Sequence, residues 1–147
     1  MSKAEDSFTL EQRDKILASI KEAEQHTSGQ IRLFVENKCS VDALDRAAFI
    51  FKNLKMHETK HRNGVLVYLA LKSRKFAIIG DSGIHSKSHK DFWHEIKAEM
   101  QHHFVKGDFV DGLTRGIHMI GEALKKHFPH QKDDVNELPD DIVYGAE

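Results

Sequence analysis

The residues best placed for chemistry gather where two apolar segments end in polar turns. Residues 63–71 are Asn-Gly-Val-Leu-Val-Tyr-Leu-Ala-Leu, and the apolar run that starts at Lys75 ends in Gly80-Asp81-Ser82-Gly83. Because the first run is apolar at nearly every position, it is typical of a strand that is covered on both faces. Asp81 is therefore a carboxylate at the end of a central hairpin, which is a position typical of a functional site and equally of an ordinary turn residue.

Residues 80–83 also match the tetrapeptide around the nucleophile of chymotrypsin-class serine proteases. A catalytic triad needs a histidine base and a buried Asp on a suitable scaffold. The helix-rich pattern of this chain does not fit two β-barrels, so we do not favour a protease.

Histidine and cysteine give little indication of a metal site. The chain has 11 histidines, of which His85 and His89 are four residues apart, but no further ligand nearby completes a zinc motif. Surface histidines are the better interpretation. The single cysteine, Cys39, excludes an internal disulfide and a multi-cysteine metal site, and it is better explained as a small apolar filler than as a nucleophile.

Hydrophobic periodicity predicts four long helices. Thr9 and Gln12 have the spacing of a capping box for a first helix that ends near Gln25. The other three are expected from an N-cap at Ser40 through Leu54, from a capping box at Ser88, and from an N-cap at Asp108 as far as Pro129. Three glycines in the last helix predict close approach to its neighbours: Gly112, Gly116 and Gly121.

The strands predict a mixed sheet that is covered by helices. Residues 30–36 alternate as a strand does, and a helix separates them from the run at 63–71, so these two strands should be parallel. The connection at 72–74 is so short that the strand from Lys75 must return antiparallel. Asp81 then lies at the edge where the other two strands begin.

Oxygen ligands should collect at this edge. The edge also receives residues from the ends of neighbouring elements, namely Glu24, Ser28, Gln30, Arg62 and Asn63. The last long helix returns to the same edge, which brings three tail residues within reach: Asp134, Asn136 and Glu137. Carboxylate and amide oxygens without thiolates suit calcium or magnesium.

Length and composition limit the remaining possibilities. We expect one domain over residues 1–129 and an acidic tail over 130–147, whose composition alone favours mobility although its apolar residues are able to dock. The 22 basic and 23 acidic residues nearly cancel, which argues against nucleic acid and anionic membranes as partners. We find neither a signal peptide nor a membrane span, and we expect a cytoplasmic protein.

The chain resembles the short, soluble bacterial branch of the TPM domain family over about residues 10–144. The likeness is carried by Glu24 with residues 27–32, by residues 45–47 and 62–66, by residues 80–84, by Phe92-Trp93, and by residues 136–141. The resemblance implies an α/β/α sandwich, with a small mixed sheet flanked by about four helices. It also implies an association with divalent metal, notably calcium, and in membrane-anchored and thylakoid relatives with acid phosphatase activity and the maintenance of membrane protein complexes. It further implies an ordered tail.

Two positions depart from the family pattern. Gln30 stands where the short branch commonly has Glu, and His85 stands where the corresponding block of the long branch has an acid. Both departures argue against a metal-assisted hydrolase, and the first also argues for weaker metal binding.

Three functions follow as hypotheses. The first is a binding or regulatory module that holds calcium, with magnesium as the alternative ion, with Asp81 as the central ligand and the tail residues or Asp45 contributing. The second is a metal-assisted acid phosphatase, with His85 as a candidate general acid. The third is a protein-interaction module without metal, whose partner the sequence does not identify.

Overall fold

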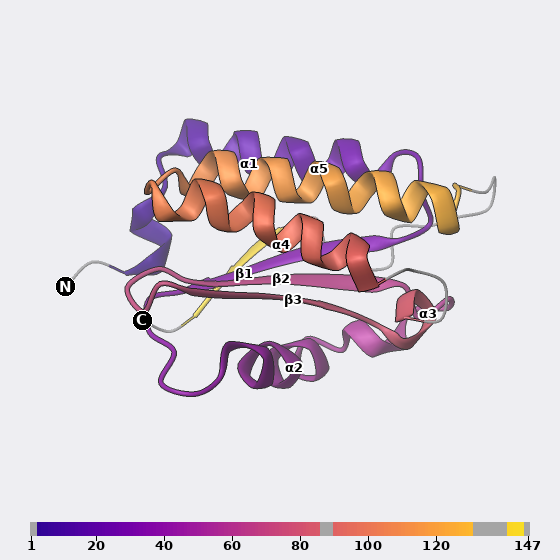
Figure 1. Ribbon diagram of the computed structural model, residues 1–147, viewed down its shortest axis with the longest axis horizontal. Helices are drawn as coiled ribbons and strands as arrows, with labels where there is room; N and C mark the ends of the chain where they lie inside the picture. The colour runs from indigo at the N-terminus through magenta and orange to yellow at the C-terminus, as the bar shows by residue number, and fades with distance from the viewer. Residues whose placement is uncertain (1–2, 86–89, 131–140, 146–147) are drawn as a thin grey trace.

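The chain folds into three layers, with a four-stranded sheet between two layers of helices (Figure 1). The computed structural model describes residues 3–85, 90–130 and 141–145. The elements in chain order are η1 (Ala4–Ser7), α1 (Leu10–Glu24), β1 (Gln30–Glu36), α2 (Ala43–Asn53), η2 (Met56–Glu58), β2 (Gly64–Ala70), β3 (Lys75–Gly80), α3 (Ser82–His85), α4 (Lys90–Val105), α5 (Phe109–His127) and β4 (Ile142–Tyr144). The predicted α/β/α sandwich with a mixed sheet is confirmed.

The strand order is β3-β2-β1-β4. β1 and β2 are parallel from Gln30 opposite Gly64 to Glu36 opposite Ala70. β3 returns antiparallel to β2, and β4 runs parallel to β1 at the other edge. The sheet therefore has one end where β1 and β2 begin and β3 finishes, which we call the Asp81 end, and an opposite end at Glu36.

Helices cover both faces of the sheet, but unequally. Figure 1 shows α1, α4 and α5 on one face and α2 on the other. Along β1, Ile31, Leu33 and Val35 belong to the core under the three helices, whereas Phe34 belongs to the core under α2. All seven residues of β1 and all seven of β2 are buried, because each side chain that points away from one core points into the other.

The helix ends follow local side-chain chemistry. The capping box at Thr9 is present, since its hydroxyl accepts from the Gln12 N–H while the Gln12 side chain accepts from the Thr9 N–H. The predicted N-cap at Ser40 is wrong: α2 starts later, at Ala43, because the Asp42 carboxylate accepts the Asp45 N–H at 3.2 Å. The capping box expected at Ser88 lies outside the described residues.

Glycines let α5 lie close against both of its neighbours, as the sequence predicts. A β-carbon at Gly116 would lie 2.4 Å from the Met100 sulfur of α4, and one at Gly121 would lie 2.6 Å from Cβ of Ala23 in α1. These positions are the contact points of the three-helix layer.

The tail contributes a strand that its composition did not indicate. Residues 142–144 form β4, and Ile142 is buried in the main core. The order implied by the family resemblance is thus present over this segment. No helix in the described part of the chain has the length and apolar content that crossing a bilayer requires.

Replacing Gly121 with Ala should lower the free energy of unfolding by about 1–3 kcal/mol. The added methyl would clash with Ala23, and we expect the energetic cost of this clash to exceed the gain in helix propensity of α5. Urea denaturation measures the change. Lys126→Ala, at an exposed position of the same helix, is the control and should stay within about 0.5 kcal/mol of the parent. An unchanged midpoint for Gly121→Ala would contradict the close α1–α5 contact.

Candidate functional site at the Asp81 end of the sheet

Asp81 is a buried carboxylate held by an arginine. Nε of Arg62 donates to Oδ2 of Asp81 at 2.8 Å, and a second guanidinium nitrogen donates to Oδ1 at 2.9 Å. Oδ1 also accepts the Ser82 N–H at 2.7 Å. The Asp81 side chain is 5% exposed but that of Arg62 is 50% exposed, so the arginine closes the carboxylate off from solvent. The bonds to Asp81 raise the pKa of Arg62, which keeps its charge in place.

The backbone brings these two residues together at a tight crossing. Asp81 N–H donates to the Gly64 carbonyl, and Gly83 N–H donates to the Arg62 carbonyl at 3.0 Å. Gly83 is required there, since a β-carbon would lie 2.4 Å from the His61 carbonyl oxygen. Arg62 itself adopts a left-handed conformation, with φ of 50°, which is uncommon for a residue with a side chain.

Asn63 is the most enclosed polar residue of this end, with 0% of its surface exposed. Its Nδ2 donates to Oγ of Ser28 at 3.2 Å, and its backbone carbonyl accepts the Gln30 N–H. Its Oδ1 is buried and has no hydrogen-bond partner among the described residues. Buried polar atoms are normally bonded, so this oxygen is an exception, as is the buried hydroxyl of Thr59.

Glu24 and Gln30 are the polar side chains at the start of β1, next to Asn63. The Glu24 carboxylate accepts the Ile31 N–H at 2.8 Å, so it occupies a position on the β1 edge that β4 does not reach. Gln30 is 4% exposed, and its amide nitrogen lies 3.4 Å from the Ser28 carbonyl oxygen. The predicted gathering of Glu24, Gln30, Asn63 and Asp81 at one edge is what the structure shows.

The chain also leaves for its tail from this end, as expected. The Phe128 carbonyl accepts from both Thr27 Oγ1 and Ser28 N–H, and His130 N–H donates to the His26 carbonyl at 3.1 Å. Three of the predicted ligands lie outside the described residues: Asp134, Asn136 and Glu137. His85 is the last residue of α3, so its backbone lies at the Asp81 end.

Asp45 is not brought to this end. It lies in the first turn of α2, exposed, and its neighbour Arg46 binds Glu36 at the opposite end of the sheet. Direct ligation of one ion by Asp45 and Asp81 is therefore incompatible with this arrangement.

The Glu36 end holds a polar network that the sequence analysis missed. Arg46 donates two hydrogen bonds to the Glu36 carboxylate, at 2.9 and 3.0 Å, and the Tyr68 hydroxyl donates to the same carboxylate. Burial, followed by this bond to Glu36, raises the pKa of Tyr68 above its ordinary value. The available signal was Glu36 itself, a carboxylate within a strand that is buried on both faces and therefore in need of a partner.

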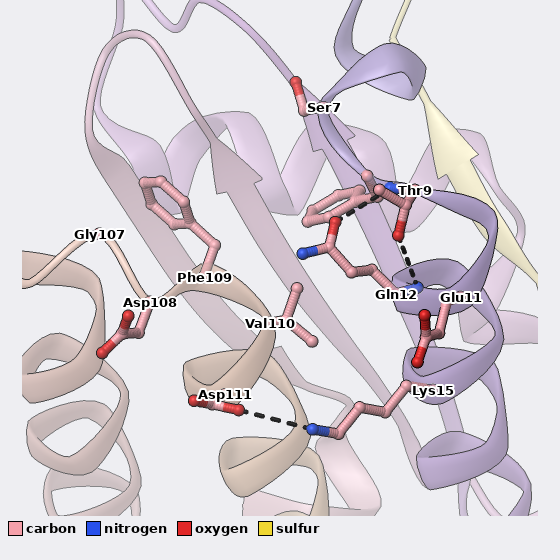
Figure 2. Close-up of a pocket in the computed structure, with 11 residues that line it drawn as sticks. Ser7, Thr9, Glu11, Gln12, Lys15, Gly107, Asp108, Phe109, Val110 and Asp111 are labelled. Carbon is pink, nitrogen blue, oxygen red and sulfur yellow. Dashed lines mark hydrogen bonds and ion pairs between the residues drawn. The ribbon is translucent and has the colours of Figure 1, made fainter.

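A pocket of about 540 Å³ lies between the starts of α1 and α5 and contains none of the predicted site residues (Figure 2). Its wall carries Glu11, Asp108 and Asp111, the last 3.6 Å from the Lys15 ammonium. The described residues include no group of three or more His, Cys, Asp or Glu side chains arranged to hold a metal ion, here or at the Asp81 end.

The three layers and the order of the helices and strands define a small α/β/α sandwich. Comparison with known proteins identifies the family to which it belongs. The family model of the TPM domain matches residues 1–123, so the chain belongs to the TPM domain family. A search of curated proteins gave no significant match.

Solved structures that are similar to the chain include the following two. The NMR structure of the BA42 protein from the psychrophilic bacterium Bizionia argentinensis is 44% identical, with a TM-score of 0.91, and the match covers 99% of this chain and 100% of that one. The N-terminal domain of the cg2496 protein from Corynebacterium glutamicum matches at 10% identity and a TM-score of 0.65, over 97% of this chain and 84% of that one, which shows a shared fold.

Replacing Glu24 with Ala should expose the β1 edge, because the Ile31 N–H loses its acceptor. We expect a loss of about 1–3 kcal/mol in unfolding free energy and faster hydrogen exchange at the Ile31 amide. Glu24→Gln keeps an acceptor oxygen and should retain most of the protection. Equal exchange rates in the parent and both variants would contradict the role of Glu24 as an edge cap.

Proposed function

We propose that this TPM-domain chain is a binding module that takes up one divalent cation, preferentially calcium, at the Asp81 end of the sheet. The observation that carries the proposal is the Asn63 side-chain oxygen, which is fully buried and has no partner among the described residues, at the turn beside Asp81. Amide and carboxylate oxygens are both ligands that calcium accepts readily.

The surroundings of Asn63 support a hard cation. The loop at Ser28 flanks Asn63 on one side, and residues 81–83 flank it on the other through their hydrogen bonds to residues 62 and 64. Ser28, Asn63 and Asp81 each offer a side-chain oxygen at this end, and oxygen is the ligand atom that calcium and magnesium prefer. The tail leaves from the same end, which gives its acids a route to the ion.

Arg62 determines how the cation enters. The guanidinium is the counter-ion of Asp81 and occupies both carboxylate oxygens, so an ion can bind Asp81 directly only by displacing it. Half of the Arg62 side chain is exposed, so it is able to turn into solvent without a rearrangement of the core. Cation binding thus replaces one positive charge with another, and competition from Arg62 lowers the affinity of the protein for the cation.

The phosphatase alternative requires a cation that polarises a phosphoryl oxygen and a side chain that donates a proton. Gln30 and His85 stand where the family pattern has acids, so two carboxylates expected of a metal-assisted hydrolase are missing from this chain. We therefore propose a binding role in preference to catalysis.

Calcium titration of three full-length variants tests the proposal, with binding followed by calorimetry and by amide NMR shifts. Asp81→Asn should abolish binding, because a charged ligand is lost. Arg62→Gln should tighten binding roughly fivefold, because it removes the internal competitor. Asp45→Asn, at the far end of the sheet, is the matched control and should bind as the parent does.

Binding that is unaffected by Asp81→Asn would place the ion elsewhere. Calcium-dependent turnover of an aryl phosphate that disappears in Asp81→Ala would establish the hydrolase alternative instead.

A further inference from the structure

A small pocket lies at the end of the sheet away from Asp81, where the β2–β3 hairpin meets the connection between α4 and α5 (Figure 1). Its volume is about 170 Å³, and its walls come from β2, the hairpin turn, the start of β3, the end of α4 and the first residue of α5. None of the residues of the proposed cation site lines it, so a ligand in this pocket is independent of the cation.

The walls of this pocket are mostly apolar. Leu69 belongs to the main core and is 2% exposed, and three partly buried phenylalanines pack against the same core. The rings of Phe76 and Phe104 meet edge to face, with centroids 5.0 Å apart, and those of Phe104 and Phe109 are 5.7 Å apart. Apolar cavities of about 150 Å³ lined by Leu, Ile and Phe are able to hold benzene. The volume and the lining therefore fit a single planar ring.

The charged part of the lining is cationic. Arg74, in the hairpin turn, makes no hydrogen bond or ion pair with another described residue. Lys75 also lines the pocket, but its ammonium is bound to the carbonyl oxygens of Cys39 and Val41, each at 3.1 Å. Neither Asp nor Glu occurs among the described residues of the lining, since Asp108 faces the larger pocket at the start of α1. The Arg74 guanidinium is thus a donor without an acceptor in the described chain.

Val105 adds apolar surface at the rim of the pocket. This large apolar side chain is 73% exposed and directly follows Phe104. A ring held between the phenylalanines would remove part of this surface from water, which favours the bound state. Apolar walls with a single convergent charged group are typical of sites for small ligands.

We propose that this pocket binds a small aromatic carboxylate, with its ring among the three phenylalanines and its carboxylate on the Arg74 guanidinium. Aromatic rings favour the edge-to-face contacts that these side chains offer. A guanidinium pairs with a carboxylate through two parallel hydrogen bonds, which fixes the orientation of the ligand. Drug-sized ligands and nucleotides need a larger pocket, of about 300 Å³ or more.

Titration of the full-length protein with benzoate, followed by amide and methyl NMR shifts, tests the proposal. We expect saturable shifts at Leu69, Val105 and Phe109, with a Kd on the order of 1 mM. Arg74→Gln should weaken binding about fivefold or more, because the carboxylate loses its ion pair. Lys72→Gln removes a cation of the same hairpin that does not line the pocket, so it is the matched control and should bind as the parent does.

Two related probes separate the ring from the charge. Benzamide keeps the ring without the charge, so it should bind the parent about fivefold or more weakly than benzoate does. It should bind Arg74→Gln and the parent equally. Acetate keeps the charge without the ring and should give no saturable shift at Leu69. Val105→Glu places an acid at the rim and should weaken the binding of benzoate but not that of benzamide.

The proposal is overturned if benzoate causes no saturable shift at the pocket residues, or if it binds Arg74→Gln as tightly as the parent. Equal affinities of the parent for benzoate and benzamide would also overturn it, because the arginine would then not recognise the carboxylate. Acetate that shifts Leu69 as benzoate does would show a site for charge alone. Arg74 and Val105 are exposed, and unchanged amide shifts in β1 establish that their variants are folded.

Discussion

The parallel pairing of β1 with β2 over seven positions determines where every candidate residue lies. Because both strands start at the same end and β3 returns antiparallel, the turns before β1 and β2 meet the turn after β3, and Asn63 is enclosed between them. The same pairing buries β1 on both faces, so its polar side chains must find partners within the fold. Glu36 does so, whereas Nε of Arg32 has no hydrogen-bond partner in the described chain.

Each end of the sheet carries an ion pair between an arginine and a carboxylate, and the two pairs differ in their partners and in their exposure to solvent. Glu36 binds Arg46 of α2 and also the fully buried Tyr68, so this pair ties α2 to the sheet. Asp81 binds Arg62, which belongs to a loop and has half of its side chain in solvent. The Arg46–Glu36 pair therefore acts as a structural support, whereas the exposed side chain of Arg62 is able to leave Asp81 more easily. Under the proposed function, the cation competes with Arg62 for the Asp81 carboxylate.

Much of the fold was predictable because it depends on periodicity and on short connections. The apolar run of β2 indicated a strand covered on both faces, and the three-residue link to β3 required an antiparallel return. What was missed depends on contacts between distant parts of the chain. The bonds from Arg62 to Asp81 join residues 19 positions apart, and β4 joins the sheet from an acidic segment whose composition favoured mobility. α3 spans four residues, too few for a periodic signal. Local competition decided the start of α2, where Asp42 provides the cap in place of Ser40.

The exchange of Arg62 for a cation is the central claim, and a crystal structure of the full-length protein grown with calcium tests it most directly. The account predicts density for one ion bonded to the Asp81 carboxylate and the Asn63 side-chain oxygen, with the Arg62 guanidinium turned into solvent. An intact Arg62–Asp81 pair at saturating calcium, with the ion absent or bound at another place, would contradict it.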